Sequence, residues 1–142
     1  AVGAFSGNLD IGPDLVVTNN PDQFKLIKRS DGMMVNWTGG DPSTVLTISG
    51  SSFSFDFQTA AVSGFAFSCI ENVSAGQFLV PASVLTQLPA SPVINAGSVN
   101  IVTRGTFSVT ARGKGVRIAS PSGVDILTAI NFWTWSFTPQ YQ

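Results

Sequence analysis

Residues able to do acid–base or nucleophilic chemistry are scarce in this chain. Its 142 residues include no histidine, one cysteine and 8 carboxylates, and the carboxylates are scattered singly. General acid–base catalysis needs a histidine or a poised carboxylate within reach of a second functional group. No serine lies three residues before a lysine, and no glycine-rich phosphate loop follows a strand and opens a helix. The sequence therefore predicts a protein that is not an enzyme and that has no metal or cofactor.

Three aromatic residues near the end of the chain are the best candidates for a binding site. Trp133 and Trp135 are two positions apart, so an extended strand places them on one face together with Phe137. On an exposed face, the three rings would form a platform able to stack on sugar rings. The same rings can instead cover the core, because large aromatic side chains supply much of a core's buried area. Exposure of the two indoles decides between these alternatives.

Two other chemically distinctive side chains are expected to be structural. Cys69 follows the alternation of Phe65 and Phe67, so we expect a small buried hydrophobic residue rather than a reactive thiol. A lone cysteine cannot form an internal disulfide. Trp37 is in register with Val35, which indicates a core position. The hydrophobic core must therefore hold this fold together.

The composition favours β structure and excludes some classes of partner. Only 11% of the residues are charged, and the net charge is -1. A nearly neutral surface gains little from nucleic acid or an anionic membrane, so neither is expected as a partner. No apolar run reaches the roughly 20 residues of a membrane span, so no direct membrane insertion is expected. The first ten residues lack the basic and apolar regions of a signal peptide.

The segment 76–90, GQFLVPASVLTQLPA, determines the predicted architecture. A strand ends at Val80, and Pro81 suits the first position of a helix, where its missing N–H is not needed. Leu85 and Leu88 then share one side of a short helix and can plug one end of a core. A helical crossover near 81–88 is how many β-sandwiches pass the chain from one sheet to the other.

Alternating apolar residues separated by turn signals predict nine to eleven short strands and almost no other helix. The clearest alternation is that of Phe53, Phe55 and Phe57, which follows a break at 50–52. We expect these rings, with Phe65 and Phe67, to define the core. The pattern predicts an all-β, antiparallel sandwich in one domain, 15–142, after a leader strand or linker at 1–14.

The last long apolar segment, 124–137, changes the parity of its apolar face. Ile126 and Ile130 occupy even positions, whereas Trp133 and Trp135 occupy odd positions. A regular strand cannot exchange its faces, because its side-chain period is two. We therefore predict a β-bulge or a bend near Ile130–Trp133, as when a final strand passes from one sheet to the other.

Several motifs occur in an order that resembles a known family. They are VNWTGGDP at 35–42, LTISG at 46–50, FSC at 67–69, and AGQFLVP at 75–81 followed by Leu85, Leu88 and Pro89. The region 15–110 resembles uncharacterised bacterial extracellular proteins with immunoglobulin-like β-sandwich modules, often the last module of a longer exported chain. The tail from Arg112 departs from that pattern, since it is longer and richer in tryptophan. The resemblance implies an immunoglobulin-like sandwich and an extracellular or cell-surface location, and it implies no active site.

These observations lead to one expected function and two alternatives. We expect a non-catalytic structural or interaction module, an adhesion or spacer unit of a larger secreted or surface protein. Its partners would be neighbouring modules, surface proteins or glycans, and an exposed edge strand could pair with a strand of a neighbour. The first alternative is a carbohydrate-binding module that uses Trp133, Trp135 and Phe137. The second is a virion or filament subunit.

Overall fold

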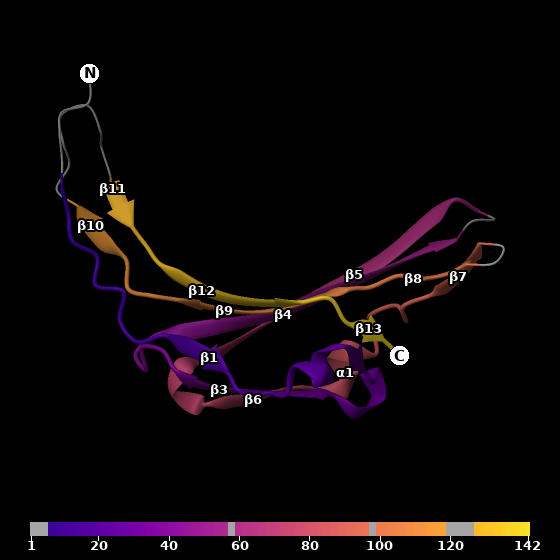
Figure 1. The fold of residues 1–142 in the computed structure, drawn as a ribbon, viewed down its shortest axis with the longest axis horizontal. Helices are drawn as coiled ribbons and strands as arrows, with labels where there is room; N and C mark the ends of the chain where they lie inside the picture. The colour runs from indigo at the N-terminus through magenta and orange to yellow at the C-terminus, as the bar shows by residue number, and fades with distance from the viewer. Residues whose placement is uncertain (1–5, 57–58, 97–98, 119–126) are drawn as a thin grey trace, which may run out of the picture.

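Strands make up most of the computed structural model, which describes residues 6–56, 59–96, 99–118 and 127–142 (Figure 1). The strands are β1 (Leu15–Val17), β2 (Leu26–Ile27), β3 (Met33–Gly39), β4 (Val45–Asp56), β5 (Ala61–Asn72), β6 (Gln77–Val80), β7 (Val93–Ala96), β8 (Val99–Val102), β9 (Thr106–Arg112), β10 (Val116–Ile118), β11 (Leu127–Ala129), β12 (Phe132–Phe137) and β13 (Gln140–Tyr141). Three 3-10 helices, η1 (Pro21–Phe24), η2 (Arg29–Asp31) and η3 (Val73–Ala75), and one α-helix, α1 (Ala82–Leu85), complete the described elements. The predicted all-β class is confirmed.

Two antiparallel sheets face each other across the core. One has the strand order β1-β3-β6, and the other has the order β12-β9-β4-β5. The three-stranded sheet lies beneath the middle of the longer, curved four-stranded sheet (Figure 1). The antiparallel hairpin β10–β11 lies beyond one end of the four-stranded sheet, and the antiparallel hairpin β7–β8 extends toward its other end. Strands β2 and β13 form a parallel pair. The two sheets thus form two layers, and hairpins extend past the three-stranded sheet at both of its ends.

The core lies between these layers and is almost entirely apolar. The buried hydrophobic side chains are Leu15, Val17, Phe24, Ile27, Met33, Val35, Trp37, Leu46, Ile48, Phe67, Val73, Val80, Leu85, Leu88, Phe107, Val109, Ala111 and Tyr141. Trp37 is 3% exposed, and its Nε1–H donates to the carbonyl of Val73 at 2.7 Å. This confirms the predicted core position of Trp37.

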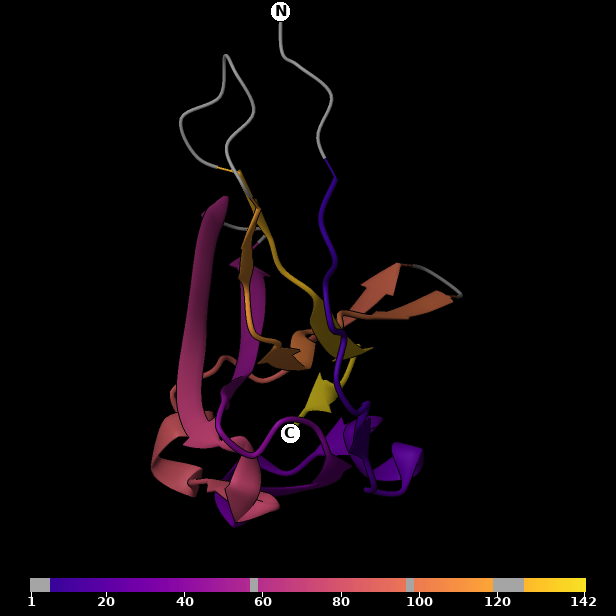
Figure 2. The ribbon, with the colours of Figure 1, turned by 90° about the vertical axis from the view of Figure 1, so that its left-hand side faces the viewer.

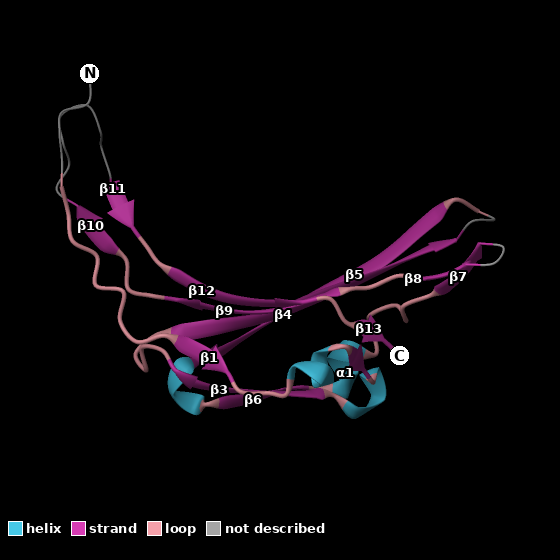
Figure 3. Ribbon diagram, viewed as in Figure 1, coloured by secondary structure: helices cyan, strands magenta, loops and turns pink. Residues whose placement is uncertain are grey.

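The predicted helical plug is present, although its helix is shorter than the segment 81–88. Pro81 stands immediately before α1, and the chain continues in turns after Leu85. Leu85 and Leu88 are both buried, as their spacing predicts. Arg29 of η2 donates a hydrogen bond to the carbonyl of Leu88 at 2.6 Å and so ties the plug to its neighbour. Figure 3 shows α1 among helical turns at one end of the three-stranded sheet.

The phenylalanine-rich hairpin differs from its prediction. Phe67 is buried, but Phe53, Phe55 and Phe65 are 60%, 42% and 37% exposed, and Phe57 lies outside the described residues. The predicted break at 50–52 is wrong, because β4 runs without interruption from Val45 to Asp56. Leu46 and Ile48 are even-numbered and face the core, so Phe53 and Phe55 face outward. The far half of the β4–β5 hairpin also extends past the three-stranded sheet, as Figure 1 shows.

An irregularity is present near the predicted Ile130–Trp133, because β11 ends at Ala129 and β12 begins at Phe132, but the extra residue lies on the other strand. Ile126, part of the predicted change of apolar face, lies outside the described residues. Phe132 pairs with Arg112, whereas Ala129 pairs with Val116. Two residues, 130–131, therefore stand opposite three residues, 113–115. The chain does not cross to the three-stranded sheet at this point, because β11 pairs with β10. Among the described residues, no helix combines the length and apolar character needed to cross a membrane.

Candidate interaction site

Trp133, Trp135 and Phe137 share one face of β12, as their spacing predicts, and this face is turned toward the core. Their partners on β9 are the buried residues Ala111, Val109 and Phe107. Trp133 and Phe137 are half-buried against the core, whereas Trp135 is 38% exposed. Only one ring of the three therefore presents a large part of its surface to solvent.

Both indole N–H groups donate hydrogen bonds to the segment where β1, the first strand of the other sheet, begins. Trp133 donates to Oδ1 of Asp14 at 3.0 Å, and Trp135 donates to the carbonyl of Leu15 at 3.2 Å. Asp14 and Thr18 hold the hydrogen bonds that join this segment to β3, so the carbonyl of Leu15 points away from β3. We call these two indoles and their acceptors the indole clasp. It joins the beginning of β1 to β12 and so connects an edge strand of one sheet to an edge strand of the other.

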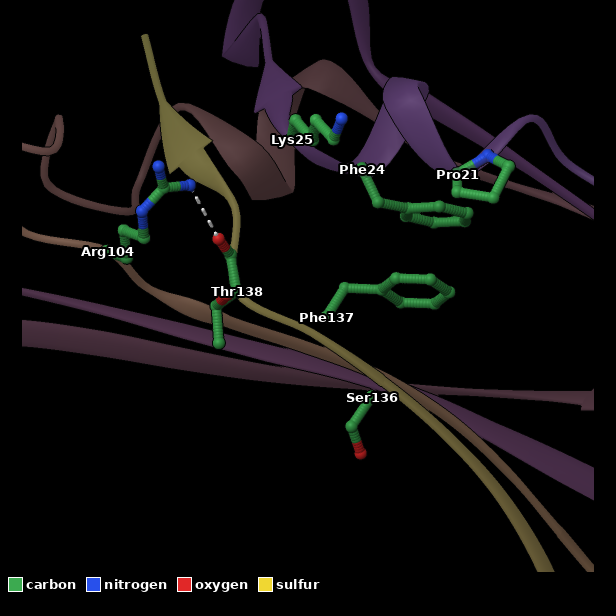
Figure 4. Close-up of a pocket in the computed structure, with 7 residues that line it drawn as sticks. All are labelled: Pro21, Phe24, Lys25, Arg104, Ser136, Phe137 and Thr138. Atoms are coloured by element: carbon green, nitrogen blue, oxygen red, sulfur yellow. Dashed lines mark hydrogen bonds between the residues drawn. The ribbon is translucent and has the colours of Figure 1, made fainter.

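The three aromatic side chains do not share one surface hollow. Trp133 and Trp135 border a hollow of about 430 Å³, together with Asp14, Leu15, Val16, Phe132 and Thr134. Phe137 borders another of about 420 Å³, where its ring stacks on Phe24 with centroids 3.9 Å apart (Figure 4). Arg104 also borders this second hollow and donates a hydrogen bond to the carbonyl of Thr138 at 3.2 Å. The structure thus brings Trp133 and Trp135 together and places Phe137 in a different environment.

The longest unpaired backbone edge among the described residues belongs to β5. This strand pairs with β4 on one side, and no described strand pairs with its other side. Figure 2 shows the long magenta ribbon of β5 along one side of the molecule. The N–H of Val73 donates to the carbonyl of Thr44 at 3.0 Å, which continues the β4–β5 register by one pair.

This hydrogen bond shows which backbone groups of β5 point toward β4 and which point away from it. In an antiparallel pair, bonded and non-bonded residue pairs alternate. Because Val73 and Thr44 form a bonded pair, the odd-numbered residues of β5 bond to β4. The even-numbered residues direct their N–H and C=O groups away from the sheet. We call the outward groups of Val62, Gly64, Ala66, Ser68 and Ile70 the β5 edge.

The side chains beside the β5 edge are unusually apolar for an exposed strand. Val62 and Ile70 are each 67% exposed, and Phe53 on the neighbouring strand is 60% exposed. All three lie on the outer face of the four-stranded sheet. The middle of that face carries hydroxyl pairs across neighbouring strands, namely Ser49–Ser108, Ser51–Thr106 and Thr110–Thr134. The outer face thus has a hydroxyl-rich centre and apolar positions along β5.

The perturbed titratable groups fit structural roles. Burial raises the pKa of the Cys69 thiol, which is half-buried against the core, so little of it is in the reactive thiolate form. Burial also raises the pKa of Tyr141, whose hydroxyl donates to the carbonyl of Thr106 at 2.8 Å. Hydrogen bonds from Ser43 lower the pKa of Asp41, and Lys114, 3.2 Å away, lowers it further.

No protein-family model, curated protein or solved structure matches this chain. The role of the β5 edge therefore has to be inferred from its own chemistry. The sequence contains a signal for this edge: AVSGFAFSCIEN carries one charge, Glu71, and no proline. Natural edge strands usually carry lysine, proline or a bulge that prevents pairing with other chains. The alternation of its phenylalanines instead predicts a core strand, and Phe65 is 37% exposed.

Proposed function

We propose that the chain is a non-catalytic interaction module that binds a partner by strand addition at the β5 edge. The observation that carries this proposal is the row of outward N–H and C=O groups along β5, which no described strand satisfies. In strand addition, the backbone hydrogen bonds supply affinity and the alternating side chains supply specificity. The exposed side chains of Val62 and Ile70 are placed to contact an incoming strand.

The wider assignment within this proposal is an immunoglobulin-like module of a bacterial secreted or surface protein. Two facing antiparallel sheets and an apolar plug at α1 support the sandwich part of it. The location rests on the resemblance of the motifs at 35–42 and 75–81. In such a protein, strand addition would connect neighbouring modules or attach the module to a surface protein.

Selection of peptides from a random phage-displayed library tests strand addition without knowledge of the partner. We expect the enriched peptides to alternate apolar residues. Their binding should slow hydrogen exchange at the even-numbered amides of β5, while the odd-numbered amides, already bonded to β4, change little. Enriched peptides that leave the even-numbered amides unprotected would overturn the proposal.

Two proline variants provide a matched comparison. Ala66→Pro removes an outward N–H of β5 and leaves the bonds to β4 in place, because proline is tolerated where an edge residue faces solvent. Thr134→Pro does the same on β12, the opposite edge of the same sheet, since the bond from Gly113 N–H to Asn131 C=O makes the even-numbered residues of β12 point outward. Peptide binding should be lost in Ala66→Pro and kept in Thr134→Pro.

The second candidate function is carbohydrate binding at the hollow of about 430 Å³ beside the indole clasp. The observation that favours it is the 38% exposure of Trp135, next to Phe132 and the carboxylate of Asp14. Aromatic faces with a polar group beside them suit sugar rings. Phe137 borders another hollow and would not contact the same sugar unit.

Tryptophan fluorescence with a panel of soluble polysaccharides tests this candidate. Sugar binding at the clasp would shift the emission and protect it from acrylamide quenching, and Trp135→Ala would abolish the shift. Trp37→Phe, which removes only the buried indole, would keep it. Emission that no polysaccharide changes would exclude this function.

A further inference from the structure

We infer that the strand added at the β5 edge is β5 of a second copy of this chain, running antiparallel about a two-fold axis at Ala66. This inference rests on the proposed function and identifies its partner. A two-fold axis makes the contact isologous, so β5 must be complementary to its own reverse. The evidence is the set of side-chain pairs that β5 forms with β5 of an antiparallel second copy.

Only some registers are geometrically allowed. Residues opposite each other in an antiparallel pair must point to the same face of the sheet, so an even-numbered residue must face an even-numbered one. Two allowed registers overlap nearly the whole of Ala61–Asn72: one is centred on Ala66 and the other on Phe67. Both use the outward groups of the even-numbered residues, so the side chains distinguish them.

The register centred on Ala66 pairs the most exposed apolar side chains of the strand. It sets Val62 opposite Ile70 of the second copy, and both of these side chains are 67% exposed in one chain. Cross-strand pairs of β-branched residues stabilise a sheet. The register centred on Phe67 sets Ile70 opposite Gly64. It also sets Val62 opposite Asn72, so neither apolar side chain gains a partner.

The other face of the strand supports the same register. With the axis at Ala66, Phe65, which is 37% exposed, lies opposite the largely buried Phe67 of the second copy. Glu71 is the one charged residue of β5, and it lies opposite Ala61, so no like charges meet. The two four-stranded sheets would then form one continuous sheet of order β12-β9-β4-β5-β5-β4-β9-β12.

Cysteine cross-linking of the full chain tests the register directly. In a Cys69→Ala background, Ala66→Cys would place two thiols on directly opposed, hydrogen-bonded residues with Cα atoms about 5.5 Å apart, which a disulfide can span. Ser68→Cys, on the same face of the same strand, would place its thiols about 14 Å apart along the strands, too far for a disulfide. We expect an oxidised dimer from Ala66→Cys and none from Ser68→Cys.

Sedimentation of the unmodified chain over a range of concentrations gives an independent measurement. We expect a monomer–dimer equilibrium, and Ala66→Pro should raise the dimer dissociation constant about thirtyfold, because symmetry removes two hydrogen bonds at once. Thr134→Pro should leave that constant unchanged. A monomer at every concentration, or cross-linking of Ser68→Cys as efficient as that of Ala66→Cys, would overturn the inference.

The outcomes separate this inference from the proposed function. If the chain is monomeric but selected peptides protect the even-numbered amides of β5, the edge accepts strands and the partner is a different protein. If neither dimer nor peptide binding is found, both proposals fail. Association that Thr134→Pro weakens as much as Ala66→Pro would place the contact away from β5.

Discussion

The polar aromatic side chains each connect two distant elements. All three tryptophans and the single tyrosine donate a hydrogen bond to another segment: Trp37 to Val73, Trp133 to Asp14, Trp135 to Leu15 and Tyr141 to Thr106. A buried Trp or Tyr usually pairs its N–H or O–H in this way. Each ring therefore supplies both apolar area and a specific contact between segments that are 35 or more residues apart.

Removal of a single hydrogen-bond donor should lower the free energy of unfolding more when the ring that carries the donor is more deeply buried. We expect Trp37→Phe to lower the free energy of unfolding by about 2–4 kcal/mol, because it removes a buried hydrogen bond to the carbonyl of Val73 and leaves a cavity. Trp135→Phe should cost about 0.5–1.5 kcal/mol, since the ring of Trp135 is 38% exposed and less packing is lost. Urea unfolding measures both values, and equal losses would contradict this view of the clasp.

Tyr141 predicts a specific dependence of stability on alkaline pH. Burial raises its pKa in the folded chain above the ordinary value of 10.0, so the folded state keeps the phenolic proton longer than the unfolded state. The stabilisation is complete below pH 10 and is lost as pH rises further, by up to about 1.4 kcal/mol per pH unit. The tyrosinate absorption of this single tyrosine should appear only on unfolding.

Tyr141→Phe is the control for that titration. Its free energy of unfolding near neutral pH should be about 1–2 kcal/mol lower, because it lacks the hydrogen bond to the carbonyl of Thr106. Above pH 10 its stability should fall less steeply than that of the unmodified chain. If the two proteins lose stability in parallel above pH 10, groups other than Tyr141 govern alkaline unfolding.

At the scale of elements, predictions from local periodicity succeed for β3 and the α1 plug and fail for the long strand β4. Alternation correctly predicted the core residues of β3 and the plug at Leu85 and Leu88, because local periodicity determines which face of an element is apolar. It fails at Phe53, because Gly50 predicts a break but lies inside β4. Periodicity also cannot tell whether a second layer covers a given stretch of strand. The acceptors of the indole clasp were not predictable either, since they lie 119 and 120 residues away in sequence.

Position 50 lies inside β4 and holds a glycine because no side chain fits there. A Cβ at this position would lie 2.7 Å from Cε1 of Phe67 and 2.8 Å from the hydroxyl oxygen of Tyr141. We expect Gly50→Ala to destabilise the protein by about 1–3 kcal/mol, as overpacking in a core does. Thermal unfolding measures this loss.

Gly64 on β5 provides the matched control. A Cβ there meets the ring of Phe53, but that ring is 60% exposed and can turn into solvent. Gly64→Ala should therefore change stability by less than about 0.5 kcal/mol. A loss comparable to that of Gly50→Ala would mean that the exposed arm of β4–β5 is more rigidly packed than its exposure indicates.

At the scale of the whole molecule, the low charge and the unprotected β5 edge act together. The net charge is -1, so two copies meet with little electrostatic repulsion. The strand itself carries only Glu71. Most single-domain proteins prevent such pairing with charges on the edge. A chain with neither general repulsion nor local charge on its longest described edge strand is suited to association through backbone hydrogen bonds.

An association through backbone hydrogen bonds between chains of low charge predicts how the dimer responds to salt. Raising the ionic strength from about 0.05 to about 1 M screens charge interactions almost completely. An interface held by backbone bonds and the Val62–Ile70 contact should keep its dissociation constant within about threefold, because salt weakens neither. Sedimentation at both salt concentrations measures this. A dissociation constant that rises tenfold or more would mean that charged residues outside β5, such as Lys25 or Arg104, carry the contact, and the β5 edge would then not be its centre.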